Sequence, residues 1–95
     1  MKYYYNIYTH KNGKLKGDVD DEYYAKDEET KRVLCLYISR NRDGSTELVY
    51  FNNKWVFEKE ISRGEFLKSF ITSIFKTEPS GVTYKEILNF LFNNH

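Results

Sequence analysis

Two segments near the C-terminus, ISRGEF at residues 61–66 and VTYKEI at residues 82–87, share one local pattern. In each, an apolar residue precedes a Ser or Thr, and a Glu stands three positions after that hydroxyl residue, followed by a second apolar residue. This spacing is typical of a capping box, in which the hydroxyl binds the N3 amide and the Glu binds the N-cap amide. The flanking apolar pair is typical of a hydrophobic staple, which fixes how the chain enters a helix. The pattern predicts that two helices begin here.

The residues after each start follow the helical repeat. The first helix is expected at about 63–76, with an apolar face made of Phe66, Leu67, Phe70, Ile71, Ile74 and Phe75. Pro79 separates the helices, because the residue before a proline is driven out of the helical region. The second helix is expected at about 84–93, with Phe90 off its apolar stripe and partly exposed. That stripe is expected to turn inward and consists of Tyr84, Ile87, Leu88 and Leu91.

The first half of the chain carries β signals. Residues 3–9 are aromatic and β-branched, which favours a strand. Asn12-Gly13 predicts a two-residue hairpin turn, with a short return strand from residues 14–16. We expect an acidic loop at 17–21, because Gly and Asp have low β-propensity, and a further short strand at 22–26.

The clearest strand signal lies at 32–39, after a polar turn at 27–30. This run is apolar on both faces, which predicts a strand that is central in its sheet or covered on both sides. A hairpin loop is expected at 40–45, with Gly44 free to take the left-handed conformation.

Two more strands are expected at 46–51 and 54–60, joined by a tight turn at Asn52-Asn53. The sequence therefore predicts an α+β fold. We expect an antiparallel meander of three to five strands, followed by two helices packed on one of its faces. Ninety-five residues make a single domain, mainly β over 1–60 and a helical hairpin over 61–95. Nine Tyr, seven Phe and one Trp must supply most of its core.

Charge is segregated along a chain whose net charge is only +1. Residues 1–17 contain four lysines and no acid, whereas residues 18–29 contain seven acids and one lysine. Two interpretations remain open. The two segments neutralise each other in the fold as solvated surface, or the acidic segment forms a patch that docks on a basic partner.

The single cysteine, Cys35, excludes an internal disulfide and a zinc site of the usual spacing. No apolar run is long enough for a transmembrane helix, and the first residues lack the apolar core of a secretory signal. We therefore expect a cytoplasmic protein that does not bind membranes.

Catalysis is the function class with least support. His10 lies beside the expected turn, His95 is the last residue, and Cys35 lies in the most apolar strand, where a buried thiol is inert. No phosphate-binding loop, dinucleotide turn or zinc-protease motif is present. The acidic run 18–22 offers oxygens to a hard cation, but it lacks the Gly and the distant Glu of an EF-hand loop, and a solvated loop explains it better. We expect no enzyme activity, no cofactor and no metal.

Nucleic-acid binding is the alternative. The two helices have helix-turn-helix spacing, and the side chains that could project from the second are Tyr84, Lys85, Asn89 and Asn93. Their surroundings are not basic enough for a typical recognition helix. The strand tyrosines could also stack bases, beside Arg40 and Arg42 at a loop tip, but the motif that makes such stacking specific is missing.

Protein binding fits best, because tyrosine, arginine and concentrated charge make up interface hot spots and steering patches. The residues expected to contact a partner are Asp18, Asp20, Asp21, Glu22, Tyr23, Tyr24, Arg40 and Arg42. The common residues Lys, Tyr, Asn, Phe and Ile have AT-rich codons, as in low-GC bacteria and their phages. In its small size, AT-rich coding, lack of catalytic groups and segregated charge, the chain resembles phage-encoded inhibitors of host defence such as anti-CRISPR proteins, although it shares no motif with them. That resemblance implies a host protein or ribonucleoprotein as partner, blocked by steric occlusion or by acidic mimicry of nucleic acid.

Overall fold

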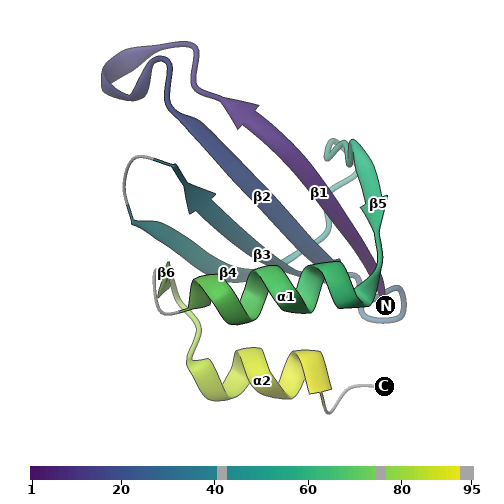
Figure 1. Ribbon diagram of the computed structural model, residues 1–95. Helices are drawn as coiled ribbons and strands as arrows, with labels where there is room; N and C mark the ends of the chain where they lie inside the picture. The colour runs from purple at the N-terminus through teal and green to yellow at the C-terminus, as the bar shows by residue number, and fades with distance from the viewer. Residues whose placement is uncertain (41–42, 75–76, 93–95) are drawn as a thin grey trace.

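The computed structural model describes residues 1–40, 43–74 and 77–92 and shows an α+β fold, as predicted (Figure 1). One six-stranded sheet has the order β5-β1-β2-β3-β4-β6, and two helices lie on one side of it. Every neighbouring pair is antiparallel except β4 with β6. The elements are β1 (Lys2–Thr9), β2 (Val19–Lys26), β3 (Arg32–Ser39), β4 (Gly44–Tyr50), β5 (Lys59–Ile61), α1 (Arg63–Ser73), β6 (Thr77–Pro79) and α2 (Tyr84–Phe92).

The hairpin of β1 and β2 is longer than the sequence predicts and extends past the helices (Figure 1). The expected two-residue turn at Asn12-Gly13 is wrong, because a short 3-10 helix at Gly13–Leu15 occupies the connection and the return strand begins only at Val19. The expected acidic loop at 17–21 is also wrong from Val19 onward. These residues are strand, paired with β1 in a register that sets Asp21 opposite Ile7.

The prediction that β3 is covered on both sides is confirmed. Alternate residues point to opposite faces of a strand, so Leu34 and Leu36 face the helices while Val33 and Cys35 face away. All four are fully buried. The second face is covered by a mainly aromatic layer that packs on Val33 and Cys35; it consists of the buried Tyr24 with Tyr4, Tyr37, Val49, Phe51, Trp55 and Phe57.

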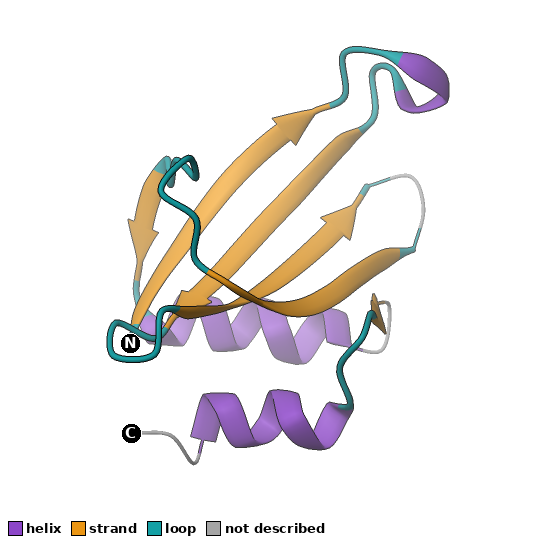
Figure 2. Ribbon diagram, turned by 180° about the vertical axis from the view of Figure 1, so that it is seen from behind, coloured by secondary structure: helices purple, strands orange, loops and turns teal. Residues whose placement is uncertain are grey.

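The expected strand at 54–60 is mostly wrong, since only Lys59–Ile61 pairs with β1. Residues 51–58 instead form a loop that crosses the face opposite the helices (Figure 2). Asn6 of β1 anchors this loop, because its side chain donates to the Val56 carbonyl at 2.8 Å and accepts from the Glu58 amide at 2.7 Å. The Phe57 ring stacks on Tyr4 with centroids 4.2 Å apart. Burying aromatic rings explains why this segment leaves the sheet.

Gly44 begins β4 and does not adopt the expected left-handed conformation. Glycine is required here because any larger residue would have a Cβ that collides with the backbone carbonyl of Tyr37 on β3. The edge of β4 is then covered in part by β6, which the sequence did not predict. Three residues ending in a proline are too short a strand to leave a periodic signal.

Both predicted helix starts are confirmed. The Ser62 hydroxyl accepts from the Glu65 amide at 3.1 Å, and Thr83 accepts from Glu86 at the same distance. Each Glu carboxylate in turn accepts a hydrogen bond from the N-cap amide, at 3.4 Å from Ser62 and 3.1 Å from Thr83. The staple residues of each start lie in the same core cluster.

The helices are rotated relative to the predicted orientation. Phe90, expected to be partly exposed, is only 2% exposed and lies in the core with Ile87 and Leu91. Leu88 and Tyr84, expected to point inward, are about half exposed. In α1 the buried residues include Phe66 and Phe70 as predicted, but Ile71 faces solvent and Ser73 is buried. The expected core residue Phe75 lies outside the described residues. Within the part of the chain that the structure describes, neither helix has the length and apolar character needed to cross a membrane.

Candidate functional site

The most distinctive surface is an apolar groove between α1 and α2. Its volume is about 340 Å³, and it is lined by Phe70 of α1, Ile74 just after α1, and Tyr84, Ile87 and Leu88 of α2. The two helices are joined through β6, so α2 runs back beside α1 (Figure 1). Phe70 and Ile87 line this groove and also belong to the main core, so the groove reaches down to the core between the two helices.

Two of the lining side chains are half exposed: Tyr84 is 49% exposed and Leu88 48%. The same two helices carry two further exposed apolar side chains outside the groove lining, Ile71 at 65% and Phe92 at 46%. The three α2 residues are spaced by four, so they form one stripe along the helix. An exposed apolar stripe marks an interaction site more often than isolated exposed residues do.

A cation at the start of α1 lies beside the end of α2. The Arg63 guanidinium lies 5.9 Å from the centre of the Phe92 ring. Arginine over an aromatic face is a frequent feature of protein interfaces, because the planar group stacks while it keeps its donors free.

A second groove of about 360 Å³ lies between α1 and the strands β1, β2 and β5. It is polar, with two lysines and a glutamate among its lining; the residues are Tyr5, Tyr23, Lys59, Ile61, Glu65, Lys68, Ser69 and Thr72. The carboxylate of Glu65 already bonds Ser62 in the helix cap. This groove therefore lacks a concentrated apolar or charged feature that would select a ligand.

The acidic residues predicted as contacts are held by neighbours in this fold. Asp21 receives two hydrogen bonds from Arg40, at 2.8 and 3.0 Å, and a third from the Tyr5 hydroxyl at 2.6 Å. The bonds from Arg40, with that from Tyr5, hold the pKa of Asp21 below its usual range against the opposing effect of burial. Asp20 is buried, and one of its carboxylate oxygens lies 2.9 Å from His10 Nε2.

The other predicted contact residues of β2 point to both faces of the sheet. Burial raises the pKa of Glu22, although its carboxylate accepts a hydrogen bond from the Tyr24 hydroxyl at 2.9 Å. Tyr24 belongs to the aromatic layer on the face away from the helices, whereas Tyr23 packs on the helix side. The predicted set therefore does not form one continuous surface. Asp18 is half-buried just before β2, and Arg42 lies outside the described residues.

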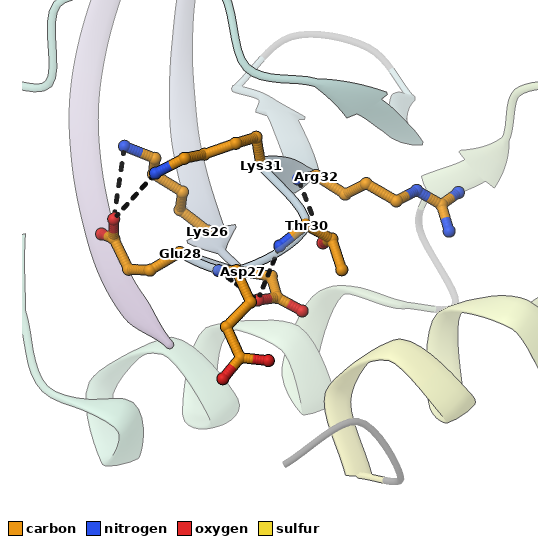
Figure 3. A network of polar contacts seen from close by, with 7 residues as sticks. Lys26, Asp27, Glu28, Thr30, Lys31 and Arg32 are labelled. Atoms are coloured by element: carbon orange, nitrogen blue, oxygen red, sulfur yellow. Dashed lines mark hydrogen bonds and ion pairs between the residues drawn. The ribbon is translucent and has the colours of Figure 1, made fainter.

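The acidic segment ends in a turn between β2 and β3 that is closed by its own polar groups (Figure 3). Asp27 accepts hydrogen bonds from the amides of Glu29 and Thr30, at 2.9 and 3.4 Å. The Glu28 carboxylate lies 3.8 Å from Lys26 Nζ and 3.9 Å from Lys31 Nζ. These ion pairs join the acidic segment to Lys26 and Lys31, within or next to it, and not to the lysines of residues 1–17.

The residues of the nucleic-acid alternative lie on α2. Tyr84, Lys85 and Asn89 are exposed, as that alternative requires, but Tyr84 also forms a wall of the apolar groove. Asn93 lies outside the described residues. Sequence reasoning missed Ile71, Leu88 and Phe92 as surface residues. The signal available was that α2 is apolar on most of its circumference, more than one buried face requires.

The groups considered for catalysis are not assembled with one another. Cys35 is fully buried in β3, and burial raises the pKa of its thiol to about 12. His10 lies at the far end of the β1–β2 hairpin beside Asp20 and Tyr8. Over the described ranges, no three His, Cys, Asp or Glu side chains are placed to hold a metal ion. Comparison of this chain with known protein families, curated proteins and solved structures finds no match.

Proposed function

We propose that this chain is a non-catalytic protein-binding domain that recognises its partner through the groove between α1 and α2. The observation that carries this proposal is an apolar furrow whose wall includes the half-exposed side chains of Tyr84 and Leu88. Ile71 and Phe92 add exposed apolar surface on the same two helices. Aromatic and aliphatic anchors at a concave, apolar surface are the usual energetic centre of a protein interface.

The exposed area also indicates how strong such binding can be. Complete burial of a large apolar side chain contributes about 1.5–3 kcal/mol. The exposed fractions of Ile71, Tyr84, Leu88 and Phe92 together correspond to about two complete side chains, so a partner that covers all four gains about 3–6 kcal/mol before the costs of association. A micromolar complex requires about 8 kcal/mol net. A partner must therefore also contact the polar rim of the groove.

The identity of the partner as a nucleic-acid enzyme of a host defence system is the finer part of this proposal. It is supported by the resemblance in size and composition to phage-encoded inhibitors. Of the two modes of inhibition, steric occlusion has the better support, because Asp20 and Asp21 are already hydrogen-bonded to His10 and Arg40. Acidic mimicry needs carboxylates that are available to the partner's cations.

A peptide-display selection tests the binding role. Random peptides are selected on the wild-type chain and on two variants, Leu88→Glu in the groove and Val56→Glu on the opposite face. Val56 is 76% exposed, so its variant adds the same charge at an equally accessible apolar site. We expect sequences that bind wild type and Val56→Glu but not Leu88→Glu. If no selected sequence depends on Leu88, the proposal is wrong.

The nucleic-acid alternative predicts a different pattern. Gel shifts with random duplex DNA and with RNA, at low and moderate salt, would show salt-sensitive binding that is lost in Lys85→Ala and Asn89→Ala. Such binding, together with a failed peptide selection, would replace the proposed function by a nucleic-acid-binding regulator. We expect no retardation that depends on these two residues.

A further inference from the structure

We infer that the chain forms a two-fold dimer in which the open edge of β1, residues 7–9, pairs with the same edge of a second copy. This edge is a different surface from the groove between α1 and α2, and the dimer does not depend on the function proposed for that groove. The backbone groups of the edge, its side chains and the charges at its two ends support the pairing.

The outer edge of β1 is covered along only part of its length. β5 pairs with Tyr3, Tyr4 and Tyr5, and among the described residues no other strand pairs with β1 on that side. The loop before β5 reaches as far as Asn6, whose side chain binds its backbone. Residues 7–9 lie beyond this point, where the β1–β2 hairpin extends past the helices (Figure 1).

The direction of the backbone groups along this edge follows from a bond at the end of the hairpin. The His10 amide donates to the Asp18 carbonyl at 2.9 Å, so it points toward the β2 side. Because the direction alternates along a strand, the N–H and C=O of Tyr8 also point toward β2, whereas those of Ile7 and Thr9 point outward. Within the described ranges, these outward groups have no backbone partner. Such an edge is a template for another strand.

A second copy of this edge fits it about a two-fold axis at Tyr8. In an antiparallel register centred there, Ile7 of one copy lies opposite Thr9 of the other, and both residues have outward-pointing groups. Each of the two Ile7–Thr9 pairs can then exchange two hydrogen bonds. The two Tyr8 residues face each other at a non-hydrogen-bonded position, where side chains come closest. The edge is therefore complementary to itself, as a two-fold interface requires.

The side chains of the edge are exposed and uncharged. Ile7 and Tyr8 are each 48% exposed, and Thr9 is exposed as well. Natural edge strands that avoid pairing often carry a charge or a proline, and residues 7–9 contain neither. Pairing with a second copy would bury each Tyr8 ring against the other, and aromatic cross-strand pairs of this kind stabilise sheets.

The charges at the two ends of the edge favour the antiparallel arrangement. The hairpin tip carries three exposed lysines that form no ion pair with a described residue: Lys11, Lys14 and Lys16. At the other end, Glu58 and Glu60 flank Lys59 and give this exposed segment a net negative charge. Antiparallel pairing directs the basic tip of each copy toward the acidic end of the other, whereas parallel pairing would place the two basic tips together.

Cysteine cross-linking tests the register. The two residues at position 8 would face each other with a Cα separation of about 4.5 Å, within the range of a disulfide. We expect Tyr8→Cys to form a disulfide-linked dimer in oxidised glutathione, while the native Cys35 stays unreactive because it is fully buried. Ile71→Cys is the matched control, at an exposed apolar site on α1, and should cross-link much more slowly. Equal cross-linking of the two variants would overturn the inference.

Sedimentation equilibrium tests the hydrogen bonds. We expect a monomer–dimer equilibrium of the wild type between about 10 and 500 µM, because so short an interface is weak. Thr9→Pro removes the outward N–H of each copy, and proline is tolerated on an edge strand whose N–H faces solvent. Two hydrogen bonds per dimer are then lost, so the dissociation constant should rise about tenfold or more.

Tyr50→Pro is the matched control for this substitution. Tyr50 ends β4 beyond the residues that pair with β6, and it is 71% exposed. The next amide, that of Phe51, donates to the Lys31 carbonyl on the β3 side, so the N–H of Tyr50 points away from β3. This variant should leave the dissociation constant within about twofold of wild type. Circular dichroism checks that both proline variants are folded.

Several outcomes would overturn the inference. These are a wild type that stays monomeric at every concentration, and a folded Thr9→Pro variant that dimerises as tightly as wild type. Assemblies larger than a dimer that are lost in Tyr50→Pro would show head-to-tail pairing of β1 with β4. A dimer that is lost in Leu88→Glu would show association through the groove. A failed peptide selection on the groove leaves the inference standing, because that test concerns the other surface.

Discussion

The orientation of α2 decides whether the groove exists, and two alanine substitutions in this helix test it. Phe90 is 2% exposed and packs in the main core, whereas Leu88, two residues earlier, is 48% exposed. Phe90→Ala should cost about 3–5 kcal/mol, because it removes buried surface and leaves a cavity. Leu88→Ala should cost about 1 kcal/mol, since only half of a leucine's burial is lost.

Urea unfolding followed by tryptophan fluorescence measures both values. Trp55 is the only tryptophan and lies in the aromatic layer on the far face of the sheet, so it reports global unfolding and not a local change in α2. With a slope of about 1.5 kcal/mol/M, the midpoint should fall by about 2–3 M for Phe90→Ala and about 0.7 M for Leu88→Ala. The slopes themselves should agree with wild type.

A domain of this size has a total stability of about 5–14 kcal/mol, so Phe90→Ala can leave it unfolded. Phe90→Leu keeps most of the volume and should remain folded with a smaller loss than the alanine variant. If Leu88→Ala costs as much as Phe90→Ala, or more, Leu88 faces the core. In that case the groove and the function proposed for it would both be refuted.

Three other outcomes follow from the fold. Gly44→Ala should destabilise the domain by about 1–3 kcal/mol, because the new Cβ would meet the Tyr37 carbonyl; chemical denaturation measures this. Arg40→Gln should lower stability at neutral pH but progressively less as the pH falls. The folded pKa of Asp21 lies below its unfolded value, so its ion pair stabilises the fold above the unfolded pKa and is lost as pH falls through the folded pKa. Cys35 should react with a thiol reagent at pH 8 only on unfolding, because burial raises its pKa to about 12.

The Gly44 prediction has a matched control, and the Arg40 and Cys35 predictions each have a result that would contradict them. Gly64→Ala, in the first turn of α1, is the matched control for Gly44 because a Cβ there meets only the Ser62 hydroxyl at 3.8 Å. It should stabilise the helix by about 0.5–1 kcal/mol. A wild-type advantage over Arg40→Gln that persists to pH 2 would exclude the ion pair as its cause. Rapid labelling of Cys35 in the native protein would show that β3 is not covered on both faces.

Local signals in the sequence predicted what local physics determines. The two helix starts depend on side chains within four residues of each other, so the Ser and Thr caps were found in their predicted places. The continuous apolar run of β3 correctly indicated a strand buried on both faces. In these cases no distant partner was needed to decide the conformation.

Partners distant in sequence decided the elements that the prediction missed. Residues 19–21 form a strand despite poor β-propensity, because β1 pairs with them and Arg40 compensates Asp21 from nineteen positions away. Trp55 and Phe57 leave the expected strand because aromatic surface on the far face of the sheet is available to them. Neither partner is visible in a local window.

The apolar surplus of α2 links these observations to function. Six of its nine residues are apolar or aromatic, and only Ile87, Phe90 and Leu91 are buried. AT-rich coding does not require the other three, since Lys and Asn codons are equally AT-rich and would suit an exposed position better. The fold itself therefore does not account for Leu88 and Phe92. If they are retained for a partner, Leu88→Lys with Phe92→Lys should abolish peptide binding and lower the urea midpoint by no more than about 1.5 M, whereas a midpoint that falls as far as that of Phe90→Ala would assign both residues to the core.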